Sequence, residues 1–157
     1  TAIEGPADLA QVTRQLLAHT RGVRAPTTAI GSAILAGYTY LEAHPDCWKR
    51  TLDLSGDGET NVGPLPETIG ENLRPAGVTV NGLVVGAGDQ DGDDERFVDI
   101  KQLSSYYRAN VMRGPGAFVE VALGYEDYAA TMERKLLREL ASIAIGQADL
   151  DRISPAD

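Results

Sequence analysis

A short acidic turn follows an apolar run near the middle of the chain, where residues 51–54 lead into two glycines on either side of Asp57. In an α/β protein, such a break is typical of the carboxyl end of a buried parallel strand, and open parallel sheets bind ligands at those ends. A carboxylate held there by a glycine turn is a candidate ligand for a hard cation such as Mg²⁺. Ser55 and Glu59 flank Asp57 and are weaker binding candidates.

A second polar segment, at residues 26–31, contains a hydroxyl that could meet Asp57 in space. Its Thr28 is also placed to cap the helix expected after it, which does not exclude a water-mediated contact to a metal. Asp57 has a simpler interpretation as well, because an acid in a glycine-rich turn can orient the turn by accepting hydrogen bonds from backbone N–H groups. The residues alone leave both interpretations open for each side chain.

Other patterns with chemical potential do not complete a site. His19 and His44 are far apart and have no partner at metal-ligand spacing, and Ser55 is not part of a Gly-x-Ser-x-Gly turn. The glycines at residues 82–88 do not lead into a helix as those of nucleotide-binding loops do. The alternating acids at residues 89–95 lack the glycine and the final glutamate of a calcium loop, so we expect a solvated loop. Without a base or enough ligands, we expect no enzymatic activity.

Two further sets of charged residues are expected to be structural. Asp53 lies within a strand and, if buried, needs a partner such as a backbone amide or a hydroxyl. The basic face of the last helix, with Arg134, Lys135 and Arg138, is expected to be solvated.

The composition is that of an ordinary soluble domain. The chain has 157 residues, of which 43% are hydrophobic and 24% are charged, and its net charge is −9. The negative charge disfavours binding to nucleic acid or anionic lipid, because phosphate groups would be repelled. No apolar run approaches the ~18 residues of a membrane span, so none is expected. The single cysteine, Cys47, excludes an internal disulfide and a multi-cysteine zinc site.

Helix and strand patterns alternate along the chain. Apolar residues at helical spacing predict helices, and β-branched apolar runs between turn signals predict strands. Small residues in the second helix would allow it to lie close to a sheet. The expected helices are residues 6–20, 31–43, 66–73, 98–112 and 125–145, and the expected strands are residues 48–54, 78–85 and 117–122.

This alternation predicts an α/β sandwich with a mostly parallel sheet. We expect one domain at residues 1–146 and a tail at residues 147–157. Only three strands are evident, although a parallel sheet covered on both faces usually has more, and no strand precedes the first helices. The chain also begins at Thr1 rather than Met, so we expect a fragment or processed product whose first strands lie upstream.

Six segments occur in an order that is quite specific as a set: residues 27–34, 52–58, 76–83, 106–111, 114–119 and 134–139. Together they resemble the von Willebrand factor A (vWA) fold, and more closely a bacterial vWA-like family of unknown function, DUF1194. The resemblance covers about residues 25–141. It implies a Rossmann-like three-layer sandwich, with the N-terminal strands absent from this chain.

The vWA fold carries a metal-ion-dependent adhesion site (MIDAS) built from three loops, which hold an Asp-x-Ser-x-Ser motif, a Thr and an Asp. In this sequence Thr28 matches the second loop and Asp57 the third, and Asp-x-Ser-x-Ser does not occur. In the family that motif lies upstream, so the chain is similar to the C-terminal portion of such a domain. The resemblance implies that Mg²⁺ or another divalent cation binds in the intact domain, and that it binds weakly or not at all in this chain.

These features predict a protein-binding vWA-like module in which the cation bridges Thr28 and Asp57 to an acidic side chain of a partner. The resemblance implies that partner binding shifts the metal and the last helix. The alternative is a metal-free structural or assembly module that associates through an exposed sheet edge, including as a homodimer. Family members often carry secretion signals, so the resemblance implies a periplasmic or cell-envelope location.

Overall fold

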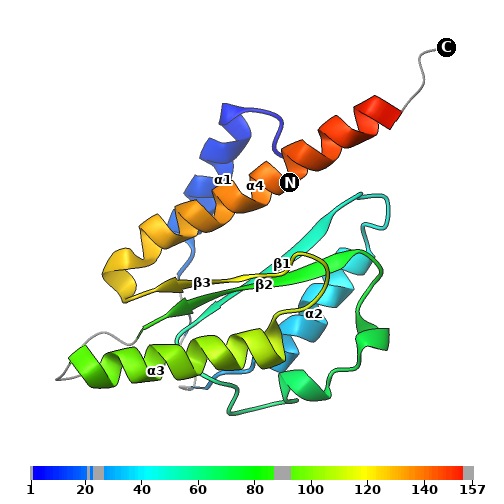
Figure 1. Cartoon of the computed structure of the whole chain (residues 1–157). Helices are drawn as coiled ribbons and strands as arrows, with labels where there is room; N and C mark the ends of the chain where they lie inside the picture. Colours follow the sequence, from blue (N-terminus) through cyan, green and yellow to red (C-terminus); the bar gives the residue numbers. More distant parts are fainter. Residues whose placement is uncertain (1, 21, 23–26, 87–92, 154–157) are drawn as a thin grey trace.

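A parallel sheet of three strands forms the middle layer of the molecule (Figure 1). The structure, a computed structural model, describes residues 2–20, 22, 27–86 and 93–153, with the backbone alone for 93–98 and 142–153. The strand order is β1-β2-β3, and both neighbouring pairs are parallel. The strands are β1 (Arg50–Gly56), β2 (Val78–Val85) and β3 (Val119–Ala122).

The register of the strands brings their carboxyl ends to one edge of the sheet. Gly56 of β1 is paired with Val84 of β2, and Val85 is paired with Ala122 of β3. The residues that follow these three ends therefore share one rim. Every residue of β2 is buried, as expected for a central parallel strand that is covered on both faces.

Helices cover both faces of the sheet. In the described part of the chain they are α1 (Pro6–Ala18), α2 (Ile30–Glu42), α3 (Asp93–Tyr106) and α4 (Tyr128–Ile153). α2 and α3 lie on one face and α4 on the other (Figure 1), which confirms the predicted α/β, Rossmann-like architecture. α2 can approach β1 closely because it contains Gly37, where a Cβ would lie only 2.5 Å from the Leu52 side chain. None of these helices combines the length and the apolar character that a bilayer span requires.

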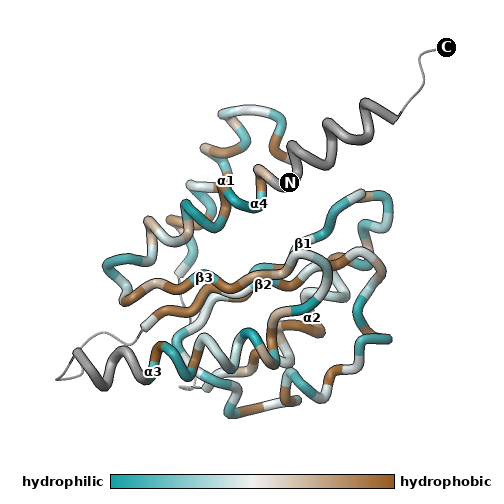
Figure 2. Tube along the Cα trace, viewed as in Figure 1, coloured by the Kyte–Doolittle hydropathy of each residue, from teal (hydrophilic) through white to brown (hydrophobic). Residues whose placement is uncertain are grey.

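The main apolar core lies between the sheet and the pair formed by α2 and α3, where Figure 2 shows apolar segments facing one another. A smaller cluster on the α4 side joins Leu83, Val85 and Ala122, with Tyr128 and Met132 packed against it. α1 has no buried residue, so it adds nothing to either cluster. The main core consists of Ile30, Ile34, Tyr38, Ile69, Val78, Val80, Val84, Leu103, Tyr107 and Val111.

A buried ion cluster joins α4 to the sheet. The Lys135 ammonium is fully buried and pairs with Asp53 of β1 and, at 2.6 Å, with Glu139. Glu139 also accepts a 2.9 Å hydrogen bond from Asn81 Nδ2 of β2. The expectation that Lys135 lies on a solvated face was therefore wrong, and Asp53 is partnered by an ammonium rather than by an amide or hydroxyl. The fold tolerates this buried charge because two carboxylates face it.

The connection between β1 and β2 is not a regular helix. The spacing at residues 66–73 predicted one, but the chain forms two short 3₁₀ turns, Pro66–Thr68 and Glu71–Leu73. Gly70 has an extended backbone between them, which interrupts the helical hydrogen-bond series. The two turns still provide the crossover that a parallel pair of strands requires.

Two helix boundaries also differ from expectation. α3 begins at Asp93, inside the segment that was expected to be an acidic loop, whereas Asp89 and Asp91 lie outside the described residues. α4 continues to Ile153 rather than ending at residue 145, so helical backbone extends into the expected tail.

Candidate functional site

The rim at the carboxyl end of β1 holds both predicted oxygen donors. Asp57 follows Gly56 directly, and Thr28 lies in the segment that leads into α2. Both residues line one cavity of about 280 Å³, together with Ser55 and the buried Tyr107. The structure thus brings Thr28, Ser55 and Asp57 together from two separate segments. Their role in metal binding stays a prediction.

The loop that follows β1 fixes the backbone of Thr28. The Thr28 N–H donates to Asn61 Oδ1 at 2.8 Å, and its carbonyl accepts from the Asn61 backbone N–H at 2.9 Å. The N-cap of α2 is Ala29, so the helix-cap interpretation of Thr28 was wrong. Thr28 Oγ1 instead lies beside the loop, 3.5 Å from the position that a Cβ on Gly58 would take. The hydroxyl is therefore located at the rim next to the Asp57 turn.

A side chain from a distant part of the chain contacts the Asp57 carboxylate. The Tyr125 hydroxyl donates a hydrogen bond of 2.5 Å to Asp57 Oδ2. Tyr125 belongs to a 3₁₀ turn, Tyr125–Asp127, that lies between β3 and α4. This one carboxylate therefore connects the end of β1 to the segment that starts α4.

Tyr107 lies beneath the turn at Gly56 and Asp57, at the end of β1. It is 1% exposed, and it begins a π-helical turn, Tyr107–Val111, of a kind that often occurs at functional sites. Its hydroxyl lies against Gly56, where a Cβ would overlap it. Burial raises the pKa of Tyr107 to about 12, with smaller contributions from the negative charge of Asp57 and from Tyr106. Tyr107 therefore presents a neutral hydroxyl at physiological pH.

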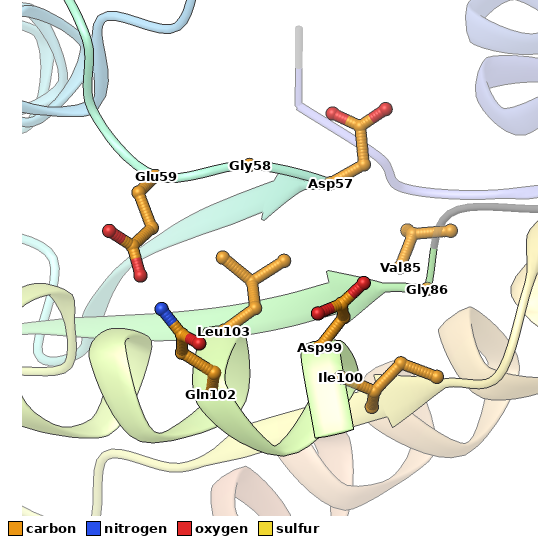
Figure 3. A pocket seen from close by; sticks show the side chains of 9 residues that line it. All are labelled: Asp57, Gly58, Glu59, Val85, Gly86, Asp99, Ile100, Gln102 and Leu103. Carbon is orange, nitrogen blue, oxygen red and sulfur yellow. The ribbon is translucent and has the colours of Figure 1, made fainter. Parts of the chain in front are cut away.

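A second cavity, of about 290 Å³, also reaches Asp57 (Figure 3). Glu59 and Asp99 line it together with apolar side chains from β2 and α3. In Figure 3 the Glu59 carboxylate points toward Gln102, whereas the Asp57 carboxylate points away from both. Glu59 therefore belongs to this cavity and not to the one that Thr28 lines. Across the described ranges, no three His, Cys, Asp or Glu side chains are grouped so that they could hold a metal ion.

The donors at the rim fit part of a magnesium site. A threonine hydroxyl and a carboxylate are the hard oxygen ligands that Mg²⁺ prefers, and Mg²⁺ usually keeps several waters in an octahedral shell. Thr28, Ser55 and Asp57 are the side-chain oxygen donors from the predicted set that share one cavity, and Tyr125 already engages one oxygen of Asp57. Further ligands would have to come from water, from a partner or from residues outside those described.

Two tyrosines at the rim were not predicted as site residues. Tyr107 was placed in the helix expected at residues 98–112, and Tyr125 was assigned to the start of the last helix. A usable signal was present for Tyr125, because it follows closely on the last strand. The rule that selected Asp57, that residues after parallel strands share one rim, applies to Tyr125 equally well.

A parallel sheet between helical layers, with polar side chains at the carboxyl ends of its strands, defines a Rossmann-like α/β protein. Residues 1–144 match the family described as a protein of unknown function, DUF1194, and the chain belongs to that family. This assignment confirms the family that the sequence motifs indicated. No curated protein and no solved structure matches the chain.

Proposed function

We propose that this chain forms part of a protein-binding, vWA-like module whose rim engages an acidic side chain of a partner through a divalent cation. The observation that carries the proposal is the convergence of Thr28 and Asp57 on one cavity at the carboxyl end of β1. These are the two residues that the vWA resemblance selects from the sequence, and they come from two separate segments of the chain.

In this proposal each side chain has a simple role. Asp57 supplies the negative charge that attracts the cation, directly or through a water molecule, and Thr28 supplies a neutral oxygen. The vacant positions of the metal accept water and the carboxylate of the partner. The sequence offers neither a clear general base nor a full ligand set, so we expect binding rather than catalysis.

A metal titration of the protein tests this proposal. Mn²⁺, a paramagnetic substitute for Mg²⁺, should broaden the amide NMR signals of Thr28 and Gly58 before those of remote residues. Asp57→Ala should weaken this binding by about tenfold or more, because it removes the one charged ligand and a charged contact is worth ~1.5–3 kcal/mol.

Asp46→Ala provides the matched control, because it removes the same charge from the exposed loop that precedes β1, at the opposite end of the strand. It should leave the pattern of broadening unchanged. Equal broadening in the wild type and in Asp57→Ala would contradict the metal role of Asp57.

A second candidate function is a metal-free assembly module. The observation in its favour is that β1 is an edge strand of the described sheet, paired with β2 on one side. An open strand edge presents backbone N–H and C=O groups to which another strand can add. A second copy of the chain could bind there and form a dimer.

Light scattering and hydrogen exchange together test the assembly candidate. If dimers form through β1, the average mass should rise with concentration, and the amides of Arg50–Gly56 should exchange more slowly at high concentration. A constant monomer mass with unchanged exchange in this strand would reject the candidate.

A further inference from the structure

The contact between Tyr125 and Asp57 spans the end of the central strand. Asp57 follows β1 and Tyr125 follows β3, whereas β2 lies between these two strands. The Tyr125 hydroxyl therefore reaches across the carboxyl end of β2. Gly86, directly after β2, allows the backbone that leads to Tyr125 to pass close by, because a Cβ there would collide with the Leu123 carbonyl and with the Ile100 side chain.

The backbone around Tyr125 is held by its neighbours. The Asp127 N–H donates to the Gly124 carbonyl at 3.2 Å. Asp127 Oδ2 accepts hydrogen bonds from the Leu123 N–H at 3.3 Å and from the Thr131 hydroxyl at 3.2 Å. The turn thus has a defined position, whereas the Tyr125 residue itself is 63% exposed. The hydrogen bond to Asp57 therefore involves a side chain that is largely open to solvent.

We propose that Tyr125 acts as a gate on the Asp57 carboxylate, because its hydroxyl competes with any cation that binds there. A hydroxyl–carboxylate distance of 2.5 Å is typical of a strong, charge-assisted hydrogen bond. A cation on Oδ2 would displace the phenol, and a cation on Oδ1 would withdraw the charge that strengthens the phenol contact. In the open form the Tyr125 ring turns into water. Little buried surface is lost, because the residue is already exposed.

The gate rests on the proposed function for the identity of its ligand, but the contact itself can be tested without metal. Tyr125→Phe removes only the hydroxyl, and Asp57→Ala removes only the carboxylate. In urea unfolding, the shift of the midpoint in the double variant should be smaller than the sum of the two single shifts, since either change alone breaks the bond. Additive shifts would overturn the gate.

The second measurement is the affinity for Mn²⁺, followed by the broadening of the Gly58 amide signal. Tyr125→Phe should lower the dissociation constant about three- to tenfold, because one hydrogen bond no longer competes. Tyr128→Phe, the same chemical change on a ring that packs against the smaller core cluster, should leave it unchanged.

The outcomes separate the two proposals. Mn²⁺ binding of equal strength in the wild type and in Tyr125→Phe would overturn the gate and leave the proposed function standing. A lack of Mn²⁺ binding in both proteins would reject the proposed function. In that case the unfolding experiment alone decides whether the Tyr125 hydroxyl is hydrogen-bonded to the Asp57 carboxylate: non-additive shifts support the bond, and additive shifts reject it.

Discussion

At the scale of single residues, two phenols lie around one exposed carboxylate. Tyr125 donates directly to Asp57, and Tyr107 lies buried under the same turn. A phenolate in either place would face the negative charge of Asp57, so both hydroxyls suit their positions only while they are protonated. The rim therefore combines acceptor oxygens on Thr28 and Asp57 with hydroxyl donors from other elements.

The buried Tyr107 predicts a loss of stability at alkaline pH. Its pKa is raised from 10.0 to about 12, so its stabilising contribution is complete below pH 10 and is lost as the pH rises toward 12. Two units of pKa correspond to about 2–3 kcal/mol of unfolding free energy across this window.

Urea unfolding between pH 9 and about pH 11.5 measures this effect, within the window given by the unfolded and folded pKa values. The wild type should lose more stability with pH than Tyr107→Phe, which has no proton to release. Tyr40→Phe, at an exposed position on α2, should behave as the wild type. Parallel pH profiles for wild type and Tyr107→Phe would show that Tyr107 titrates normally.

At the scale of elements, α4 is attached to the sheet by charge as well as by apolar packing. Lys135 lies between Asp53 of β1 and Glu139 of its own helix. Phe118, just before β3, lies under this region, with its ring centre 5.8 Å from Lys135 Nζ and 3.9 Å from the Arg138 guanidinium. These contacts set where α4 crosses the sheet, and α4 follows directly from the turn that holds Tyr125.

Removing the lysine should weaken this attachment strongly. Lys135→Met keeps most of the volume but removes the buried ammonium that pairs with Asp53 and Glu139. Loss of one partner from a buried ion pair typically costs 3–5 kcal/mol, and we expect about 2–4 kcal/mol here because Asp53 is partly exposed. Thermal or urea unfolding measures the change.

The exposed Lys101 on α3 offers the matching control, because Lys101→Met removes an equal charge from the surface. It should change the unfolding free energy by less than about 0.5 kcal/mol. A similar small change for Lys135→Met would show that the buried ion cluster does not hold α4.

At the scale of the whole molecule, the sheet is short and its outer elements differ in how firmly they are packed. The central β2 is buried along its length, whereas β1 is half-exposed and α1 has no buried residue. The best-packed part of the protein therefore lies at β2 and its helices, and both proposed binding surfaces, the rim and the β1 edge, involve the less buried β1.

The alternating pattern of apolar runs and helical spacings was sufficient to predict this architecture. A strand buried on both faces must be apolar almost throughout, so β2 was recognisable from its residues alone. Parallel connectivity then implied that Asp57 lies at a rim, because the carboxyl ends of parallel strands meet at one edge. Gly37 indicated in the same way that α2 lies close to the sheet.

Several features depended on contacts between residues far apart in the chain. A lysine on a helix is solvated by default. Of the two carboxylates that pair with the buried Lys135, Glu139 is on the same helix, whereas Asp53 lies on the distant β1. The hydroxyl of Tyr125 has no partner nearby in sequence, because its acceptor lies 68 positions away. The sequence by itself determined the layers of the fold and the rim at which polar groups gather, since periodicity and strand direction are local properties. Only the tertiary structure decided which side chains meet at that rim and which charge is buried, because those pairings depend on the register and crossing of elements that are distant in the chain.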